Sequence, residues 1–283
     1  MEKSFMEKSF LKWAGGKYRL LPELIPAINS LIDKKIQNQT FIEPFLGSGT
    51  VFLNVNGIEN FIINDSNQDL MSLFSLLKDD ENFIEKCSVY FKSTSNDREY
   101  FQNIVKKYNT LATQEQKAHM FLYLNKHCFN GLMRFNKKNF FNTPFGKYNT
   151  ISFPQTAMEN MRDKLKNTNT SLLCRNFEII LENSGFGDIV YCDPPYVDLS
   201  QGISFKQYGK DVFTIEQQKQ LAQSCFEAAQ RGARVIISNH FTDFTKKLYN
   251  KCTSYKVLDV KRSISAKGDA RKTVQEILAI YNF

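Results

Sequence analysis

The segment Asp193–Tyr196 (Asp-Pro-Pro-Tyr) has the residue types and spacing that most directly suggest chemistry. It follows the apolar run Ile189–Cys192, which is typical of a buried strand. Prolines cannot continue a sheet ladder, so the chain must turn here and present a carboxylate, a prolyl carbonyl and an aromatic ring. Open α/β sheets bind ligands at this carboxyl edge. Acceptors beside a flat ring suit a planar amine such as a nucleobase amino group, and an ordinary strand-terminating turn is the alternative.

A second candidate site follows an earlier apolar run, in Phe41–Gly49 (Phe-Ile-Glu-Pro-Phe-Leu-Gly-Ser-Gly). Glycines after a short strand let the backbone approach a ligand closely. The next strand pattern ends in Asn64-Asp65, where an acid can accept hydrogen bonds from ribose hydroxyls. The two features predict a ligand that contains a nucleoside, with a purely structural origin as the alternative. The chain has no GxxxxGK[ST] pattern, which argues against a nucleotide triphosphatase.

The segment Leu11–Lys17 (Leu-Lys-Trp-Ala-Gly-Gly-Lys) holds the single tryptophan of the chain, Trp13, beside two glycines and two lysines. Burial in a core is the usual fate of a tryptophan. A ring, a flexible turn and a cation this close together also suit a small zwitterionic or anionic group.

The stretch Lys126–Tyr148 carries five basic residues, six aromatic rings and no acid. Cations for phosphates interleaved with rings for bases are typical of nucleic-acid binding, and the net charge of +8 agrees with an anionic partner. The alternative is a basic loop packed on a small aromatic core.

A sheet must position these segments. Short apolar runs predict strands at 41–42, 61–63, 189–191 and 235–237, mostly followed by helical patterns, so we expect a largely parallel sheet. A capping box at Thr214 predicts a helix ending near Gly232, and 255–260 and 274–282 predict an antiparallel pair. Residues 67–154 have helical spacing. We therefore predict an α/β domain (1–66 and 155–283) with an inserted, mainly helical segment (67–154).

Composition excludes several classes of protein. Hydrophobic content of 42% and charged content of 23% are those of a globular protein, and no apolar run approaches the roughly 18 residues of a membrane span. The six cysteines form no CxxC pair, which favours reduced thiols in a cytoplasmic protein. The three histidines share no metal-ligand spacing with them, so no metal is expected. The sequence does not specify the oligomeric state, and a monomer is favoured.

Taken in order, the segments Lys12–Lys17, Glu43–Gly49 and Asp193–Tyr196 resemble the motifs of Dam-type DNA adenine-N6 methyltransferases. The stretch Phe129–Arg134, followed by Asn142–Tyr148, looks like that family's recognition loop, and Arg262–Ser265 is also similar. The resemblance spans residues 10 to 282, roughly the whole chain.

The resemblance implies a Rossmann-like sheet that binds S-adenosylmethionine and an enzyme that methylates adenine in GATC of double-stranded DNA. It implies that Trp13 and Lys17 hold the methionine end of the cofactor and that Asp65 holds the ribose. It assigns the cofactor cleft to Glu43, Pro44, Phe45, Gly47, Gly49 and Asp193, catalysis to Asp193, Pro194 and Tyr196, and DNA contacts to Lys12, Phe129, Asn130, Leu132, Arg134, Pro144 and Tyr148. It also implies that Phe129 inserts into the DNA stack. Family members often carry tyrosine at this position, and phenylalanine keeps the flat stacking face of tyrosine but lacks its hydroxyl.

The chemistry expected of Asp193 follows from its target. The adenine amino group is a poor nucleophile because its lone pair is delocalised into the ring. Hydrogen bonds from its N–H groups to Asp193 and a prolyl carbonyl would localise electron density on N6, and Tyr196 would stack on the base. Transfer would be direct, with no enzyme-bound intermediate.

Two rivals remain. A related turn serves methyltransferases that act on RNA or on protein glutamine amides, although the Lys12–Lys17 segment and the basic insertion argue against them. A non-catalytic DNA-binding protein is the other. A restriction partner, a phage enzyme and a solitary regulatory methylase, with roles in replication and repair, are not distinguished by one chain.

Overall fold

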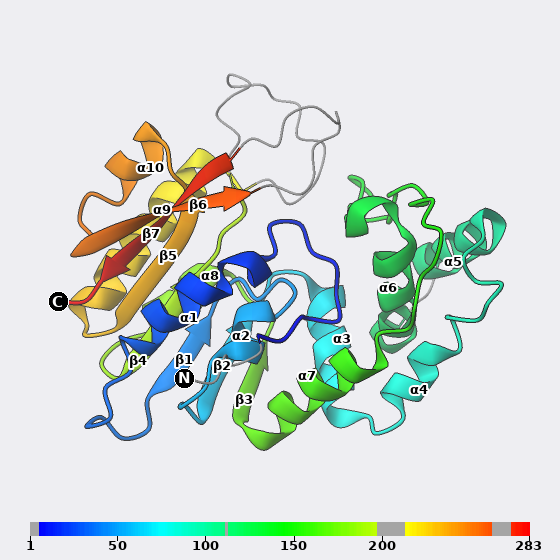
Figure 1. Cartoon of the computed structure of the whole chain (residues 1–283), viewed down its shortest axis with the longest axis horizontal. Coiled ribbons are helices and arrows are strands. Elements are labelled where there is room, and N and C mark those ends of the chain that lie inside the picture. The colour runs from blue at the N-terminus through cyan, green and yellow to red at the C-terminus, as the bar shows by residue number, and fades with distance from the viewer. Residues whose placement is uncertain (1–5, 111–112, 197–212, 262–272) are drawn as a thin grey trace.

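A computed structural model describes residues 6–110, 113–196, 213–261 and 273–283. Within these ranges one sheet contains seven strands in the order β3-β2-β1-β4-β5-β7-β6 (Figure 1). The segment Arg262–Ser265, which resembles a family motif, lies outside the described residues. The strands are β1 (Thr40–Glu43), β2 (Asn60–Asn64), β3 (Asn169–Leu173), β4 (Asp188–Cys192), β5 (Arg234–His240), β6 (Ser254–Lys261) and β7 (Thr273–Tyr281).

The largely parallel sheet predicted from the βα pattern is confirmed. Strands β1 to β5 run parallel, with Ile42 of β1 opposite Ile62 of β2 and Val190 of β4. Strand β7 runs antiparallel to both β5 and β6, which confirms the predicted C-terminal pair. The architecture is that of a Rossmann-like α/β fold. Strand β3 was not predicted, because its sequence Asn-Thr-Ser-Leu-Leu begins with three polar residues and it pairs only with β2.

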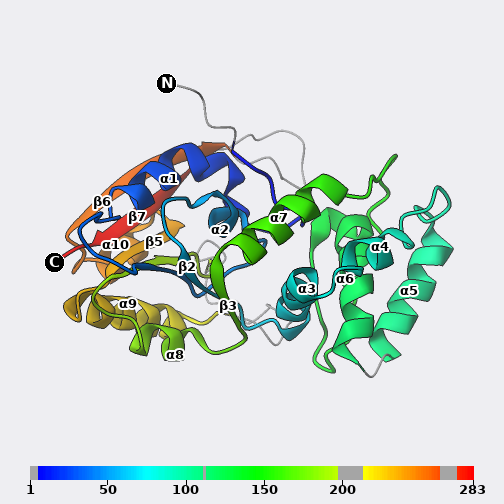
Figure 2. The same ribbon diagram turned by 90° about the horizontal axis from the view of Figure 1, so that it is seen from below.

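Both faces of the sheet are covered by helices (Figure 2). Alternation along the strands sends Phe41, Ile189 and Tyr191 to one face and Ile42 and Val190 to the other. The first face packs on α1 (Leu21–Asn29), α2 (Thr50–Asn54) and α7 (Gln155–Asn167), and the second on α8 (Phe177–Glu182) and α9 (Ile215–Gln230). Thr214 forms the predicted capping box of α9. Helix α10 (Asp243–Leu248) follows β5.

Most residues from 68 to 127 are helical, as predicted, and form a bundle beside the sheet (Figure 1). Thr113 caps the longest helix of the bundle, accepting a hydrogen bond from Gln116 N–H at 3.3 Å. The boundary proposed at 67–154 stays a prediction. The bundle contains α3 (Gln68–Asp79), α4 (Phe83–Ser88), α5 (Arg98–Thr110) and α6 (Gln114–His127). Two short 3₁₀ turns lie elsewhere in the described chain: η1 (Lys17–Leu20) precedes α1, and η2 (Phe129–Gly131) follows α6.

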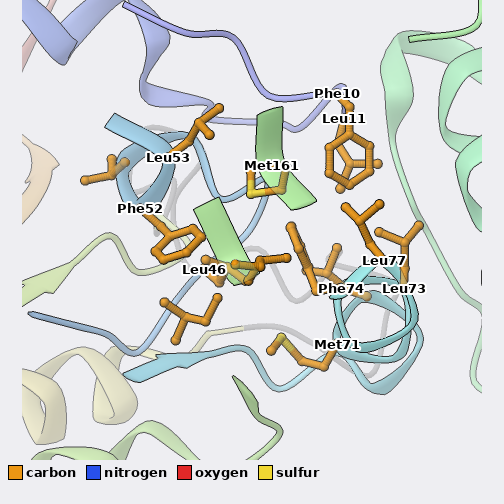
Figure 3. Packing of buried hydrophobic residues seen from close by; sticks show 14 of the residues in the cluster. Phe10, Leu11, Leu46, Phe52, Leu53, Met71, Leu73, Phe74, Leu77 and Met161 are labelled. Atoms are coloured by element: carbon orange, nitrogen blue, oxygen red, sulfur yellow. The ribbon is translucent and has the colours of Figure 1, made fainter. Parts of the chain in front are cut away.

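One apolar cluster continues from the sheet into the bundle. Phe74 of α3 packs edge-on against Phe10 with ring centroids 5.7 Å apart, and both are fully buried. Figure 3 shows Met161 of α7 and Leu46, from the turn after β1, in the same packing. This shared core holds the bundle against the turn that follows β1. No helix in the described part of the chain is long and apolar enough to cross a membrane.

Strand β1 lies between β2 and β4, so the chain adds β2 and β3 on one side of β1 and then adds β4 and β5 on the other side. Such a reversal opens a crevice at the carboxyl ends of the two central strands. Glu43 ends β1, and Asp193 directly follows β4. The fold therefore brings the two predicted sites to the same edge.

Candidate active site

A cavity of about 930 Å³ lies at the carboxyl edge of the sheet. The N-terminal segment, the turns after β1, β2, β3 and β4, and the stretch after η2 all contribute to its wall. Of the predicted site residues, the cavity wall includes Trp13, Lys17, Glu43, Pro44, Phe45, Gly47, Asp65, Leu132, Arg134, Asp193, Pro194 and Tyr196.

The turn after β1 depends on two neighbours. Gly47 has a φ of +50°, and a Cβ there would lie 2.9 Å from Trp13 Nε1, so a side chain would displace the tryptophan ring. Gly47 N–H donates to Asp65 Oδ2 at 3.0 Å, and Asn67 N–H donates to Asp65 Oδ1 at 3.0 Å. Asp65 therefore shapes the cavity as well as facing it.

Gly49, the last glycine of the same motif, packs against the core, and its part in the cofactor cleft stays a prediction. It is buried with a φ of +69°, and a Cβ there would meet Met161 at 3.1 Å and Phe74 at 3.3 Å. It is not part of the cavity wall. The absence of a side chain at Gly49 lets the turn after β1 pack closely on α3 and α7, which is a structural reason for a glycine at this position.

Glu43 is a buried acid beneath the cavity. Burial, and secondarily the Asp193 carboxylate, raises the pKa of Glu43 well above its ordinary value. Its Oε2 accepts a hydrogen bond from Phe52 N–H of α2 at 3.0 Å. Folding therefore favours the protonated form of Glu43 relative to the unfolded chain, and the side chain ties β1 to α2.

Lys17 lies at the centre of a cluster of charges formed with Asp193, Tyr196 and Glu276. The side chain of Lys17 is only 4% exposed, and its Nζ lies 2.8 Å from Asp193 Oδ1 and 3.9 Å from Glu276 Oε2. It also donates to the Tyr196 hydroxyl at 2.6 Å. One ammonium group thus lies between two carboxylates, and the Tyr196 hydroxyl lies 3.1 Å from Glu276 Oε2.

Sequence reasoning missed several described residues that contact the Asp193–Tyr196 turn, among them Ser238, His240 and Glu276. Ser238 of β5 donates to Asp193 Oδ1 at 2.9 Å, Glu276 contacts Tyr196, and the His240 ring lies 4.2 Å from the Tyr196 ring. Ser238 and His240 belong to a polar run at the carboxyl end of a buried strand, and the rule that identified Asp193 applies to them as well. Glu276 could not be found by this rule, because it lies within the antiparallel strand β7 and not at the carboxyl end of a parallel strand.

Three phenylalanines from distant parts of the chain form an aromatic wall. Phe45, Phe177 and Phe213 lie with ring centroids 5.4 to 5.7 Å apart, and all three line the cavity. Phe177 follows β3, so it was missed together with that strand. The wall provides an apolar surface suited to a flat ring.

The recognition stretch after α6 is attached to the N-terminal segment. Asn125 of α6 is fully buried, accepts from Lys12 N–H at 2.9 Å, and donates to the carbonyls of Lys12 at 2.7 Å and Gly131 at 3.2 Å. Gly131 has a φ of +68°, and a Cβ there would meet Lys12 Cβ at 2.4 Å. Lys12 Nζ lies 3.6 Å from the ring centroid of Tyr148, within cation–π range.

The rings of this stretch divide into two groups. Phe141 is buried and packs with Phe101 and Tyr108, and Phe135 and Phe145 pack against the same cluster. The alternative of a small aromatic core therefore holds for these rings. Phe129 and Phe140, by contrast, are 48% and 46% exposed. They are the rings available to a partner.

The remaining predicted DNA contacts lie near one another along the same stretch. Phe129 N–H donates to the Pro144 carbonyl at 2.8 Å, which holds the two segments of the recognition loop side by side. Asn130 has a φ of 54°, and Tyr148 donates to the Cys128 carbonyl at 3.1 Å. Arg134 is exposed at the rim of the cavity. The stretch therefore places the cation of Arg134 on the same cavity wall as the candidate catalytic turn.

One group of side chains in the described ranges has ligand atoms close enough for a metal ion: Asp80, Glu115 and His119. It lies in the helical bundle and none of the three lines the cavity. Lys86 Nζ already forms an ion pair of 2.7 Å with Asp80. The group has no part in the chemistry of the cavity.

Comparisons with known proteins agree with this geometry. The family model described as D12 class N6 adenine-specific DNA methyltransferase matches residues 13–264. The chain is 37% identical to a DNA adenine methylase of Haemophilus influenzae, over 97% of this chain and 93% of that protein. It is 34% identical to the DNA adenine methylase of Escherichia coli K12 (97% and 95% covered) and 35% identical to that of Serratia marcescens (97% and 98% covered).

Proposed function

The chain belongs to the D12 class of N6 adenine-specific DNA methyltransferases, and from that premise we propose that it transfers a methyl group from S-adenosylmethionine to adenine in GATC sites of double-stranded DNA. The observation that carries the proposal is the single cavity wall that joins Asp193, Trp13 and Arg134. A nucleoside-binding turn, an amine-accepting turn and a cationic recognition segment meet there. The enzyme would act on DNA in the bacterial cytoplasm.

The residues of the cavity fit S-adenosylmethionine. A cavity of about 930 Å³ is at the upper end of the range for small-molecule sites. The aromatic wall of Phe45, Phe177 and Phe213 would bind the adenine ring, Asp65 the ribose hydroxyls, and Lys17 with Trp13 the methionine end. When bound, S-adenosylmethionine supplies a methyl group on a positively charged sulfur.

The target amino group would bind at the Asp193–Tyr196 turn. Asp193 accepts from one N–H and the Pro194 carbonyl from the other, while the Pro195 carbonyl accepts a hydrogen bond from Gln218 Nε2 at 2.9 Å. Both contacts localise electron density on N6, and the Tyr196 ring stacks on the base. The methylated nitrogen then loses a proton readily, because its conjugate ammonium is strongly acidic.

An adenine stacked in a duplex cannot reach Asp193, so the base must be flipped out, which costs a few kcal/mol. The exposed ring of Phe129 would fill the space left behind. Arg134 would contact a guanine through O6 and N7, and Lys12, Asn130, Leu132, Pro144 and Tyr148 would contact the same site. In this proposal the catalytic domain comprises 1–66 and 155–283, and residues 67–154 form the recognition domain.

The proposal is tested by methyl transfer from labelled S-adenosylmethionine to duplexes that contain GATC, GTAC, or GATC already methylated at N6 on both strands. Label in unmodified GATC alone supports the donor, the base and the sequence together. Label in every duplex that contains adenine would overturn the roles of Arg134 and its loop. Label in RNA or protein only would favour the first rival, and cofactor binding without transfer would favour the second.

A further inference from the structure

The Asp193 carboxylate is held asymmetrically by its neighbours. Its Oδ1 accepts from Ser238 Oγ at 2.9 Å, lies 2.8 Å from Lys17 Nζ and 3.3 Å from the Tyr196 hydroxyl. Within the described part of the chain, no donor contacts Oδ2. One oxygen is thus held by three protein groups, and among the described residues the other has no donor.

The hydroxyl of Ser238 has a definite direction. An ionised carboxylate only accepts hydrogen bonds, so Ser238 must donate its single proton to Asp193. The contact of 2.9 Å between Ser238 Oγ and the Tyr191 hydroxyl must then be donated by Tyr191. Ser238 and Tyr191 are both fully buried, on neighbouring strands β5 and β4, and they point to the same face of the sheet as Asp193. Unlike Lys17 and Tyr196, neither lines the cavity.

We propose that Tyr191 and Ser238 are positioning residues that hold Asp193 Oδ1, so that Oδ2 alone accepts the hydrogen bond from the target amino group. The proposal rests on the function proposed above. A carboxylate free to rotate would offer either oxygen to Lys17, and the oxygen facing the base would vary in direction. The two buried hydroxyls remove that freedom before the base arrives, which is the preorganisation that catalysis by hydrogen bonding requires.

The test compares Ser238→Ala and Tyr191→Phe with wild type in single-turnover methyl transfer to a duplex that contains GATC. We expect Ser238→Ala to slow transfer by about 10- to 100-fold, as for the loss of one hydrogen bond to a charged group. Tyr191→Phe should have a smaller effect in the same direction, and the double variant should be no slower than Ser238→Ala. The dissociation constants of cofactor and DNA should not change. Ser184→Ala is the matched control, because Ser184 is equally buried and donates to the Ile180 carbonyl, away from the cavity.

The separation of rate from affinity distinguishes positioning from a merely structural role. A structural defect in Ser238→Ala should also weaken cofactor and DNA binding, whereas a positioning defect should lower the single-turnover rate alone. Ser184→Ala should leave both the rate and the dissociation constants unchanged.

A wild-type rate in Ser238→Ala, or a loss of rate matched by weaker cofactor and DNA binding, would overturn the inference while leaving the proposed function intact. If Ser238→Ala fails to fold, an unchanged rate in Tyr191→Phe overturns it instead. If wild type transfers no methyl group to any DNA, the proposed function itself has failed, which is a distinct result.

Discussion

Asn125 and the backbone of Lys12 form a reciprocal pair, in which the side-chain amide accepts from the N–H at 2.9 Å and donates to the carbonyl at 2.7 Å. Asn109 of α5 pairs in the same way with the backbone of Phe141. The first pair holds the segment that carries Trp13 and Lys17, and the second holds only the recognition loop.

This difference predicts distinct defects for two matched variants. Asn125→Ala leaves the buried backbone groups of Lys12 without partners, so the free energy of unfolding should fall by about 1–3 kcal/mol and cofactor affinity should fall with it. Asn109→Ala should weaken DNA binding and leave cofactor affinity unchanged. Urea unfolding and cofactor titration without DNA check both variants. Equal cofactor affinity in the two would contradict the prediction.

The central role of Asp193 predicts that Asp193→Asn loses methyl transfer by about 10³-fold or more, because an amide cannot supply the negative charge that opposes the charge developing on N6. The fold should survive, since the shape is kept and Lys17 retains contacts with Tyr196 and Glu276. Single-turnover transfer and thermal unfolding are the measurements, with Asp193→Ala as the second variant. Retained turnover in both would remove Asp193 from the mechanism.

Glu43 should make stability fall as the pH rises. Its pKa in the folded protein is raised well above the model-peptide value of 4.5, so the unfolded chain releases a proton that the folded protein keeps. Stability from this group is therefore complete below the unfolded pKa and is lost above it, by up to about 1.4 kcal/mol per pH unit. Glu43→Gln is neutral in both states, so the free energy of unfolding of this variant should rise relative to that of wild type as the pH increases above the unfolded pKa of Glu43. Urea unfolding at several pH values checks this, and parallel curves would refute it.

Phe129→Ala should reduce methyl transfer, because the cavity left by the flipped base is no longer filled. Phe140→Ala is the matched control, since Phe140 is equally exposed at 46% but lies at the hairpin beyond Arg134. A duplex in which the target adenine faces an abasic site has no pair to break, and it should restore much of the lost rate. An equal loss in both variants would point to general DNA binding instead.

Arg134→Ala should relax discrimination at one guanine by about 1–3 kcal/mol, because a bidentate contact to O6 and N7 is lost. Lys137→Ala, which removes an exposed cation from the same loop, should weaken binding to all sequences alike and reduce its dependence on salt. Rates on duplexes with each base of GATC replaced in turn provide the comparison. A uniform loss in Arg134→Ala would assign it to phosphate contact.

The fold followed from local patterns wherever the strands were apolar. Strands β1, β2, β4 and β5 are buried between helices and show continuous apolar runs, and the alternating pattern identified β6 and β7. The edge strand β3 begins with polar residues and is partly exposed, so it lacks the apolar run from which a strand is predicted. Because β3 was not predicted, Phe177, which follows β3, was not recognised as a site residue either.

The candidate site was predictable where a motif lay at the end of a recognised strand, as at Asp193 and Gly47. Pairings across the sheet were not, because the approach of Glu276 to Tyr196 depends on the register of an antiparallel strand. Gly49 shows the opposite case. It belongs to the motif, yet its neighbours are Phe74 and Met161 of the core.

The position of β1 also bears on how the chain is made. Strand β1 is complete at Glu43, but its second neighbour, β4, begins only at Asp188. At synthesis rates of about 5–20 residues per second, β1 waits on the order of ten seconds for that partner. During this interval the nascent chain exposes an unpaired, apolar strand edge while the helical bundle emerges from the ribosome. An unpaired apolar strand edge of this kind is a template for aggregation until β4 is made.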